Sequence, residues 1–131
     1  MQKEQWVDDR RSELLPISYY HIVFTVPHEL DSRILGNRKV LYKLLFDATA
    51  ETLLDFAKNQ KHLGAIPGIL AVLHTWGQQL SFHPHLHCIV SGGGMIKTKD
   101  GMIWTNAVRN KDDFLFPVKD MAIVFRAKYL H

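Results

Sequence analysis

The run His83-Pro84-His85-Leu86-His87, followed by the apolar Cys88-Ile89-Val90, constrains the fold more than any other part of the chain. Histidines at alternate positions in an apolar stretch fit an extended strand, in which residues i and i+2 point to the same side of the sheet. We therefore expect His85 and His87 side by side on one face, with Leu86 and Cys88 on the other. Such a pair of imidazoles offers two nitrogen ligands to a divalent metal ion.

The rest of the pattern predicts an α+β fold, an antiparallel sheet with helices mainly on one face. Expected strands cover residues 19–26, 69–76 and 84–90, and a hairpin that follows Gly92-Gly93-Gly94 turns at 98–101. A helix is expected from Asn37 to Asn59, with its buried stripe formed by Leu41, Leu45, Phe46, Leu53 and Phe56, and a last helix follows Pro117. Residues 1–16 are expected to be a lead-in, and residues 17–131 a single domain that is incomplete at its C-terminal end.

The charge is unevenly distributed although the net charge is only +3. No Asp or Glu occurs between Asp55 and Asp100, the stretch that holds the histidine run, and lysines flank it. Such a region is electrostatically receptive to phosphates. The alternative is that a buried pair of strands simply carries few charges.

Cys88 is the only cysteine, so the chain has no disulfide framework and no cysteine-based zinc module. The first residues lack the apolar core of a signal peptide, and no apolar run reaches the ~18 residues that a membrane span requires. We expect a soluble, cytoplasmic protein that does not engage a membrane.

His74 is the best candidate for a third metal ligand. In a hairpin of strands 69–76 and 83–91 it would lie opposite His85 or His87, on the same face. The alternative is a strand histidine bonded to a backbone carbonyl. Gln78 could also reach the site from the turn. The remaining histidines are expected to be a rim residue (His83), structural (His21 and His28) or solvent-facing (His62 and His131).

A site of imidazoles with open positions and no neighbouring carboxylate suits the polarisation of a phosphodiester. Without a local Asp or Glu as general base, the nucleophile would have to be a side chain such as tyrosine.

The histidine run resembles the His-hydrophobic-His (HUH) signature of single-strand DNA nucleases, which include replication initiators, relaxases and transposases. The longer match is to the two-tyrosine rolling-circle transposases of bacterial insertion sequences, the type numbered ninety-one. It comprises Glu13-Leu14-Leu15-Pro16, Tyr20 through Leu30, Leu73-His74-Thr75-Trp76-Gly77-Gln78, and His83 through Gly94.

This resemblance implies an HUH endonuclease fold of the ferredoxin or RRM-like kind. It also implies that His74, His85 and His87 hold Mg²⁺ or Mn²⁺ over a scissile phosphate in single-stranded DNA at transposon ends. A tyrosine then attacks to give a 5′-phosphotyrosine link, and a second tyrosine allows strand transfer.

The chain departs from the family pattern in two ways. One cysteine cannot build the zinc module with which relatives begin, and no pair of tyrosines four apart is present; Tyr129, whose partner position holds Phe125, is expected to serve packing. The chain resembles the central metal-binding part of a transposase, and we expect no cleavage by it alone.

The candidate DNA contacts are Lys97, Lys99, Arg109, Lys111 and Gln78, while Trp76 is expected in the core. Two rival functions stay open. The histidine run also fits histidine-triad nucleotide hydrolases, in which a histidine is the nucleophile and no metal is required. A non-catalytic, DNA-binding relic is the third possibility.

Overall fold

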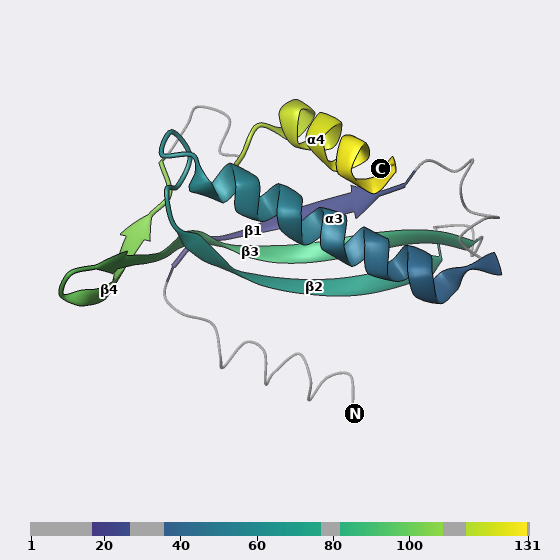
Figure 1. Cartoon of the computed structure of the whole chain (residues 1–131), viewed down its shortest axis with the longest axis horizontal. Coiled ribbons are helices and arrows are strands. Elements are labelled where there is room, and N and C mark those ends of the chain that lie inside the picture. The colour runs from purple at the N-terminus through teal and green to yellow at the C-terminus, as the bar shows by residue number, and fades with distance from the viewer. Residues whose placement is uncertain (1–16, 27–35, 77–81, 109–114, 131) are drawn as a thin grey trace, which may run out of the picture.

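A computed structural model describes residues 17–26, 36–76, 82–108 and 115–130. The elements are β1 (Tyr19–Thr25), α3 (Arg38–Lys58), β2 (Ile66–Trp76), β3 (Phe82–Thr98), β4 (Gly101–Asn106) and α4 (Val118–Leu130) (Figure 1). This is the expected α+β fold. The expected lead-in at 1–16 and the turn residues 79–81 lie outside the described residues, as do His28 and His131.

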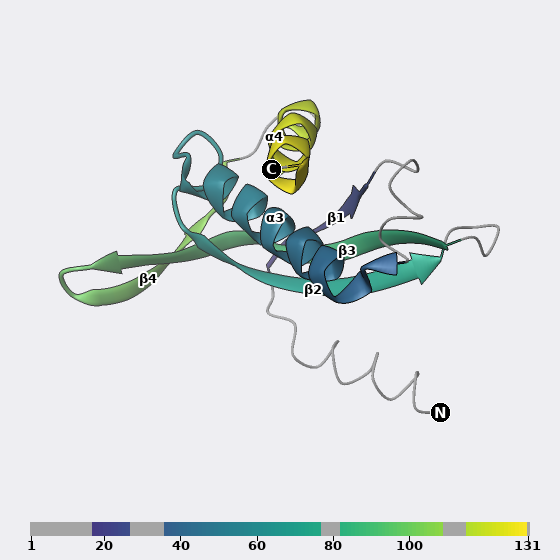
Figure 2. The same ribbon diagram turned by 45° about the vertical axis from the view of Figure 1, so that its right-hand side comes forward.

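All the strand pairs are antiparallel, in the order β1-β3-β2, and β4 pairs with the far end of β3. β3 is the longest strand, with 17 residues, and contacts the other three. The predicted hairpin is confirmed, since Met95 pairs with Trp104 and Thr98 with Gly101. Figure 2 shows this hairpin projecting from the body of the sheet.

The expected end of the third strand at residue 90 is wrong, because β3 runs straight through Gly92-Gly93-Gly94 to Thr98. A Cβ on Gly94 would lie 2.5 Å from the carbonyl oxygen of Ile66, and one on Gly93 would lie 2.5 Å from that of Thr105. The glycines are therefore where the neighbouring strands come too close for any side chain, and they do not form a turn.

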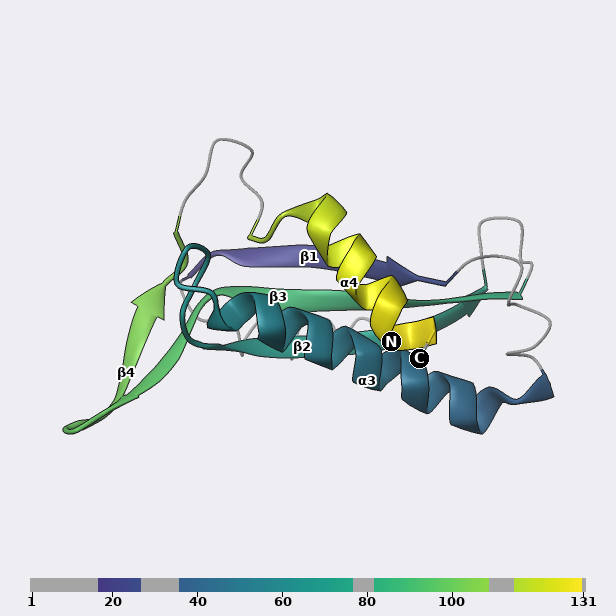
Figure 3. The same cartoon turned by 45° about the horizontal axis from the view of Figure 1, so that its top comes forward.

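Both helices cover the same face of the sheet (Figures 1 and 3), as expected. The core under them contains the inward residues of β3, namely Leu86, Cys88 and Val90, together with Phe24 of β1. Because side chains alternate along a strand, burial of Leu86 and Cys88 directs His85 and His87 to the other face. The fold thus sets the face on which the imidazoles lie.

The buried residues of α3 differ in part from those predicted. Leu45 and Leu53 are buried, but Phe46 is exposed, and Thr49 and Thr52 occupy the buried stripe in its place. Thr52 can be buried because its hydroxyl donates a hydrogen bond of 2.7 Å to the carbonyl of Ala48. In α4, Met121, Phe125 and Tyr129 are buried, and the expected packing role of Tyr129 agrees with its contact with Phe125.

His62, expected in solvent, is half-buried between the rings of Phe56 and Phe116. It lies in the turn that follows α3, where its carbonyl also accepts a hydrogen bond from the amide of Val108. Across the part of the chain that the structure describes, no helix combines the length and the apolar character that a membrane crossing requires.

Candidate metal centre

Two strands bring three imidazoles together on the face that the helices leave uncovered. His85 and His87 lie two residues apart on β3, and His74 of β2 pairs directly with His85. One nitrogen of each ring lies within 4.8 Å of the others. His74 therefore lies opposite His85, one of the two partners expected for it from the sequence.

The three rings form a compact cluster that is open on one side. The ring centroids are separated by 4.3 Å for His74 and His87, 4.9 Å for His85 and His87, and 5.3 Å for His74 and His85. An ion with bonds of about 2.1 Å holds its ligand atoms roughly 3–4 Å apart, so modest side-chain rotations would complete the set. All three rings are partly exposed, which leaves room for further ligands.

A backbone hydrogen bond orients His85. Its Nδ1 lies 2.8 Å from the carbonyl oxygen of His83, and since a carbonyl can only accept, Nδ1 carries the proton and donates. Nε2 of His85 therefore keeps its lone pair for a metal. The ring of His83, the expected rim residue, stacks on that of His85 with the ring centroids 5.9 Å apart. The backbone carbonyl of His83 fixes the tautomer of His85.

His87 has a partner that the sequence analysis missed. Nε2 of His21 lies 2.8 Å from Nδ1 of His87, and the two rings are nearly parallel, 17° apart. The prediction that His21 is isolated is wrong, because its ring contacts that of His87. The signal was the alternation in β1, which puts His21 on the same face as Val23, the pairing partner of His87.

Burial lowers the pKa of His87, and the neighbouring imidazoles of His74, His85 and His21 lower it further. The neutral ring is therefore favoured, and only the neutral ring has a lone pair to give to a metal ion. The sequence between Asp55 and Asp100 contains no acidic residue, and the three converging ligands include no carboxylate.

Trp76 was expected in the core, but its side chain is 55% exposed. It lies on the same face as His74, and the two rings stack 5.8 Å apart at an angle of 6°. The pairing register shifts between His74 and Trp76, so the strand is irregular there. An exposed indole thus adjoins the imidazole cluster.

The candidate phosphate contacts do not all lie near the cluster. Lys97 is on β3 and Lys99 in the β3–β4 turn, and the ten residues from His87 to Lys97 correspond to about 33 Å of extended strand. Gln78, Arg109 and Lys111 lie outside the described residues.

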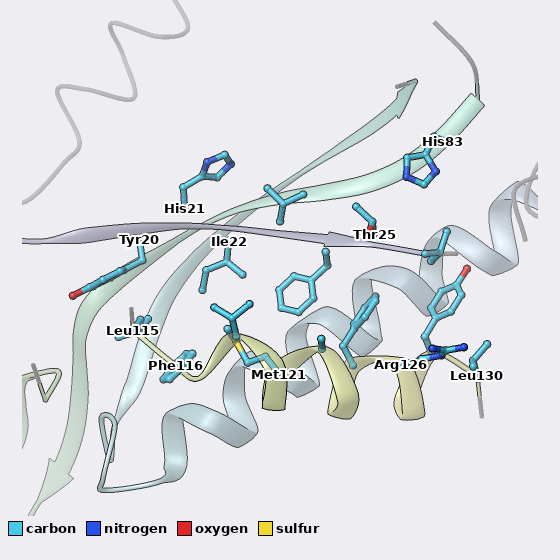
Figure 4. Close-up of a pocket in the computed structure, with 17 residues that line it drawn as sticks. Tyr20, His21, Ile22, Thr25, His83, Leu115, Phe116, Met121, Arg126 and Leu130 are labelled. Carbon is cyan, nitrogen blue, oxygen red and sulfur yellow. The ribbon is translucent and has the colours of Figure 1, made fainter. Parts of the chain in front are cut away.

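A separate cavity of about 640 Å³ lies between β1 and α4, on the helix side of the sheet. Figure 4 shows Tyr20 and Ile22 pointing into it and His21 on the opposite side of β1. Its lining is mainly apolar side chains such as Phe116, Met121 and Phe125. The imidazole cluster is therefore on the other side of the sheet from this cavity.

Comparison with known proteins shows similarity to transposases. Residues 68–131 match the model of a family described as "Putative transposase". A protein of Sinorhizobium fredii (strain NGR234) named "Putative transposase y4qJ" is 47% identical over 128 residues, which are 98% of this chain and 31% of the relative. The "Transposase for insertion sequence element IS801" of Pseudomonas savastanoi pv. phaseolicola is 33% identical over 109 residues, 83% of this chain and 25% of the relative.

The chain thus spans less than a third of the length of either relative. No solved structure matches it. Both relatives are named transposases, and the family model covers the segment that carries His74, His85 and His87. The chain is similar to these transposases, as its motifs indicated.

Proposed function

We propose that this chain is the metal-binding part of a rolling-circle DNA transposase. His74, His85 and His87 would hold Mg²⁺ or Mn²⁺ and present it to a phosphodiester of single-stranded DNA at a transposon end. The convergence of three imidazoles from two strands is the observation that carries this proposal.

The chemistry of the donors supports a phosphate ligand. Three neutral imidazoles leave the full double charge of a bound ion uncompensated, unlike a carboxylate site. When bound, the ion would neutralise the nonbridging oxygens of the phosphodiester. Imidazole nitrogens are borderline ligands and carboxylate oxygens hard ones, so this set favours Mn²⁺ over Mg²⁺.

Trp76 supports a single strand as the form of DNA. Unpaired bases expose their faces to stacking on aromatic side chains, whereas bases within a duplex are already stacked. The indole is exposed and lies beside His74, so a base next to the phosphate could stack on it.

We further propose that the attacking tyrosine is none of those described here, because no two tyrosines of the chain are four residues apart, as the resemblance requires. Tyr129 is a buried residue of α4 in contact with Phe125, on the other side of the sheet from the imidazoles. Tyr20 also points to the helix side, into the cavity beside α4 (Figure 4). The isolated chain would then bind DNA without cutting it.

The nucleotide-hydrolase alternative uses histidines of the β3 run alone and gives His74 no role. Turnover of an AMP ester in EDTA would favour it over the transposase proposal. A DNA-binding relic would bind DNA with no dependence on metal.

Fluorescence anisotropy with a labelled single-stranded oligonucleotide tests the proposal. Mn²⁺ should strengthen binding by the wild-type chain and leave binding by His85→Ala unchanged, and no covalent adduct should form. An affinity for the oligonucleotide that changes neither with Mn²⁺ nor with the His85→Ala substitution would contradict the metal-dependent role. A covalent adduct would contradict the assignment of the nucleophile.

Trp76→Ala should weaken single-strand binding by about 1–3 kcal/mol, the usual value of one stacked base, which is roughly 5- to 150-fold. Trp104→Ala is the matched control, because Trp104 is partly exposed on the distant β4. Equal effects of the two substitutions would argue against stacking at the cluster.

A further inference from the structure

We propose that His21 is a positioning residue that fixes the tautomer of His87, so that Nε2 of His87 faces the metal position. This inference rests on the proposed metal-binding function. It concerns the hydrogen bond of 2.8 Å between Nε2 of His21 and Nδ1 of His87.

A single proton lies in this hydrogen bond, and the nitrogen that carries it decides whether His87 can bind a metal. When Nδ1 of His87 holds the proton and donates it, Nε2 of His87 keeps a free lone pair. When His21 donates instead, the proton of neutral His87 must be on Nε2, where it blocks coordination. Metal binding through Nε2 therefore requires His21 to be the acceptor.

The strand register makes His21 suitable for this role. Val23 pairs with His87 and His21 with Ile89, so His21 is the diagonal neighbour of His87 on the same face. Long side chains reach across such diagonals in antiparallel sheets. The near-parallel rings, with centroids 5.0 Å apart, limit rotation of His87 about its side-chain bonds.

His21 itself is not one of the three converging ligands, because the nitrogens that approach one another belong to His74, His85 and His87. His85 is held in an equivalent way, by the backbone carbonyl of His83. In two of the three ligands, His85 and His87, Nδ1 thus donates a hydrogen bond to an acceptor on the side away from the metal position. For His87 the acceptor comes from a different strand, so β1 contributes to the site without contacting the ion.

Metal affinity tests the role of His21. His21→Ala should weaken Mn²⁺ binding by about 10- to 100-fold, the usual effect of losing a ligand's hydrogen-bond partner. His21→Gln, whose amide oxygen can accept the same bond, should restore most of the affinity. Met102→Ala, an exposed change on the distant β4, is the control and should bind as the wild type does. Wild-type affinity in His21→Ala would overturn the proposal.

Nitrogen NMR of the metal-free chain gives a readout that does not depend on metal uptake. In the wild type and in His21→Gln, the proton of neutral His87 should reside on Nδ1. In His21→Ala it should move, at least in part, to Nε2, the form that imidazoles usually prefer in water. A proton on Nε2 in the wild type would refute the positioning role even if Mn²⁺ binds. Failure of the wild type to bind Mn²⁺, with the proton on Nδ1, would instead refute the proposed metal-binding function.

Discussion

Replacing Leu86 by alanine tests the assignment of faces on which the whole site depends. Leu86 has no exposed surface, and it pairs with Phe24 on one side and Leu73 on the other, under the helix layer. Because strands and helices surround the position, the cavity cannot collapse easily. We expect a loss in the upper part of the usual range for such substitutions, about 3–5 kcal/mol in the free energy of unfolding.

Ile89→Ala is the matched control, three residues along the same strand but on the imidazole face. Its side chain is 41% exposed, so we expect a loss of only about 1 kcal/mol. Urea unfolding followed by circular dichroism measures both changes. With a slope of about 1–3 kcal/mol per molar urea, the two midpoints should differ by roughly 1–2 M. An equal loss, or a larger one for Ile89→Ala, would refute the assignment of faces and with it the position of the imidazoles.

Two further predictions concern β3. Gly94→Ala should destabilise the fold by about 1–3 kcal/mol, because the new Cβ would lie 2.5 Å from the carbonyl oxygen of Ile66. Gly36→Ala is the control, because its Cβ would have nothing within 4 Å, and it should unfold at the wild-type urea concentration. Equal midpoints would contradict the close approach of the strands. Cys88 should resist alkylation at about pH 8 in the folded chain and react rapidly in guanidinium. Burial raises the pKa of its thiol to about 11, so that roughly 0.1% is thiolate at this pH in the folded chain. Rapid labelling of the native chain, measured by mass spectrometry, would show that Cys88 is accessible.

Sequence periodicity predicted the features that depend on local alternation. The position of His85 and His87 opposite Leu86 and Cys88 follows from the two-residue repeat of a strand, and it is present in the structure. The approximate hairpin register was enough to bring His74 into the neighbourhood of the pair.

Features that depend on long-range packing were not predictable in the same way. The association of His21 with His87 requires β1 to pair with β3 in one particular register, across 66 residues of sequence. The continuation of β3 through its glycines depends on how closely β2 and β4 approach. The distance of Lys97 from the cluster follows from the continuation of β3 into the projecting hairpin (Figure 2). The alternation in β1 predicts the face of His21 but not this register, and the other two features leave no periodic signal in the sequence.

Titration of the chain with Mn²⁺, followed by calorimetry and by pulsed EPR that detects coordinated nitrogen, tests the central claim most directly. We expect one ion per chain with imidazole nitrogens as ligands, and loss of both signals in His85→Ala. His62→Ala, which removes a histidine outside the cluster, should bind the ion as the wild type does. No uptake of Mn²⁺ by the wild type, or equal uptake after all three of His74, His85 and His87 are replaced, would contradict the account.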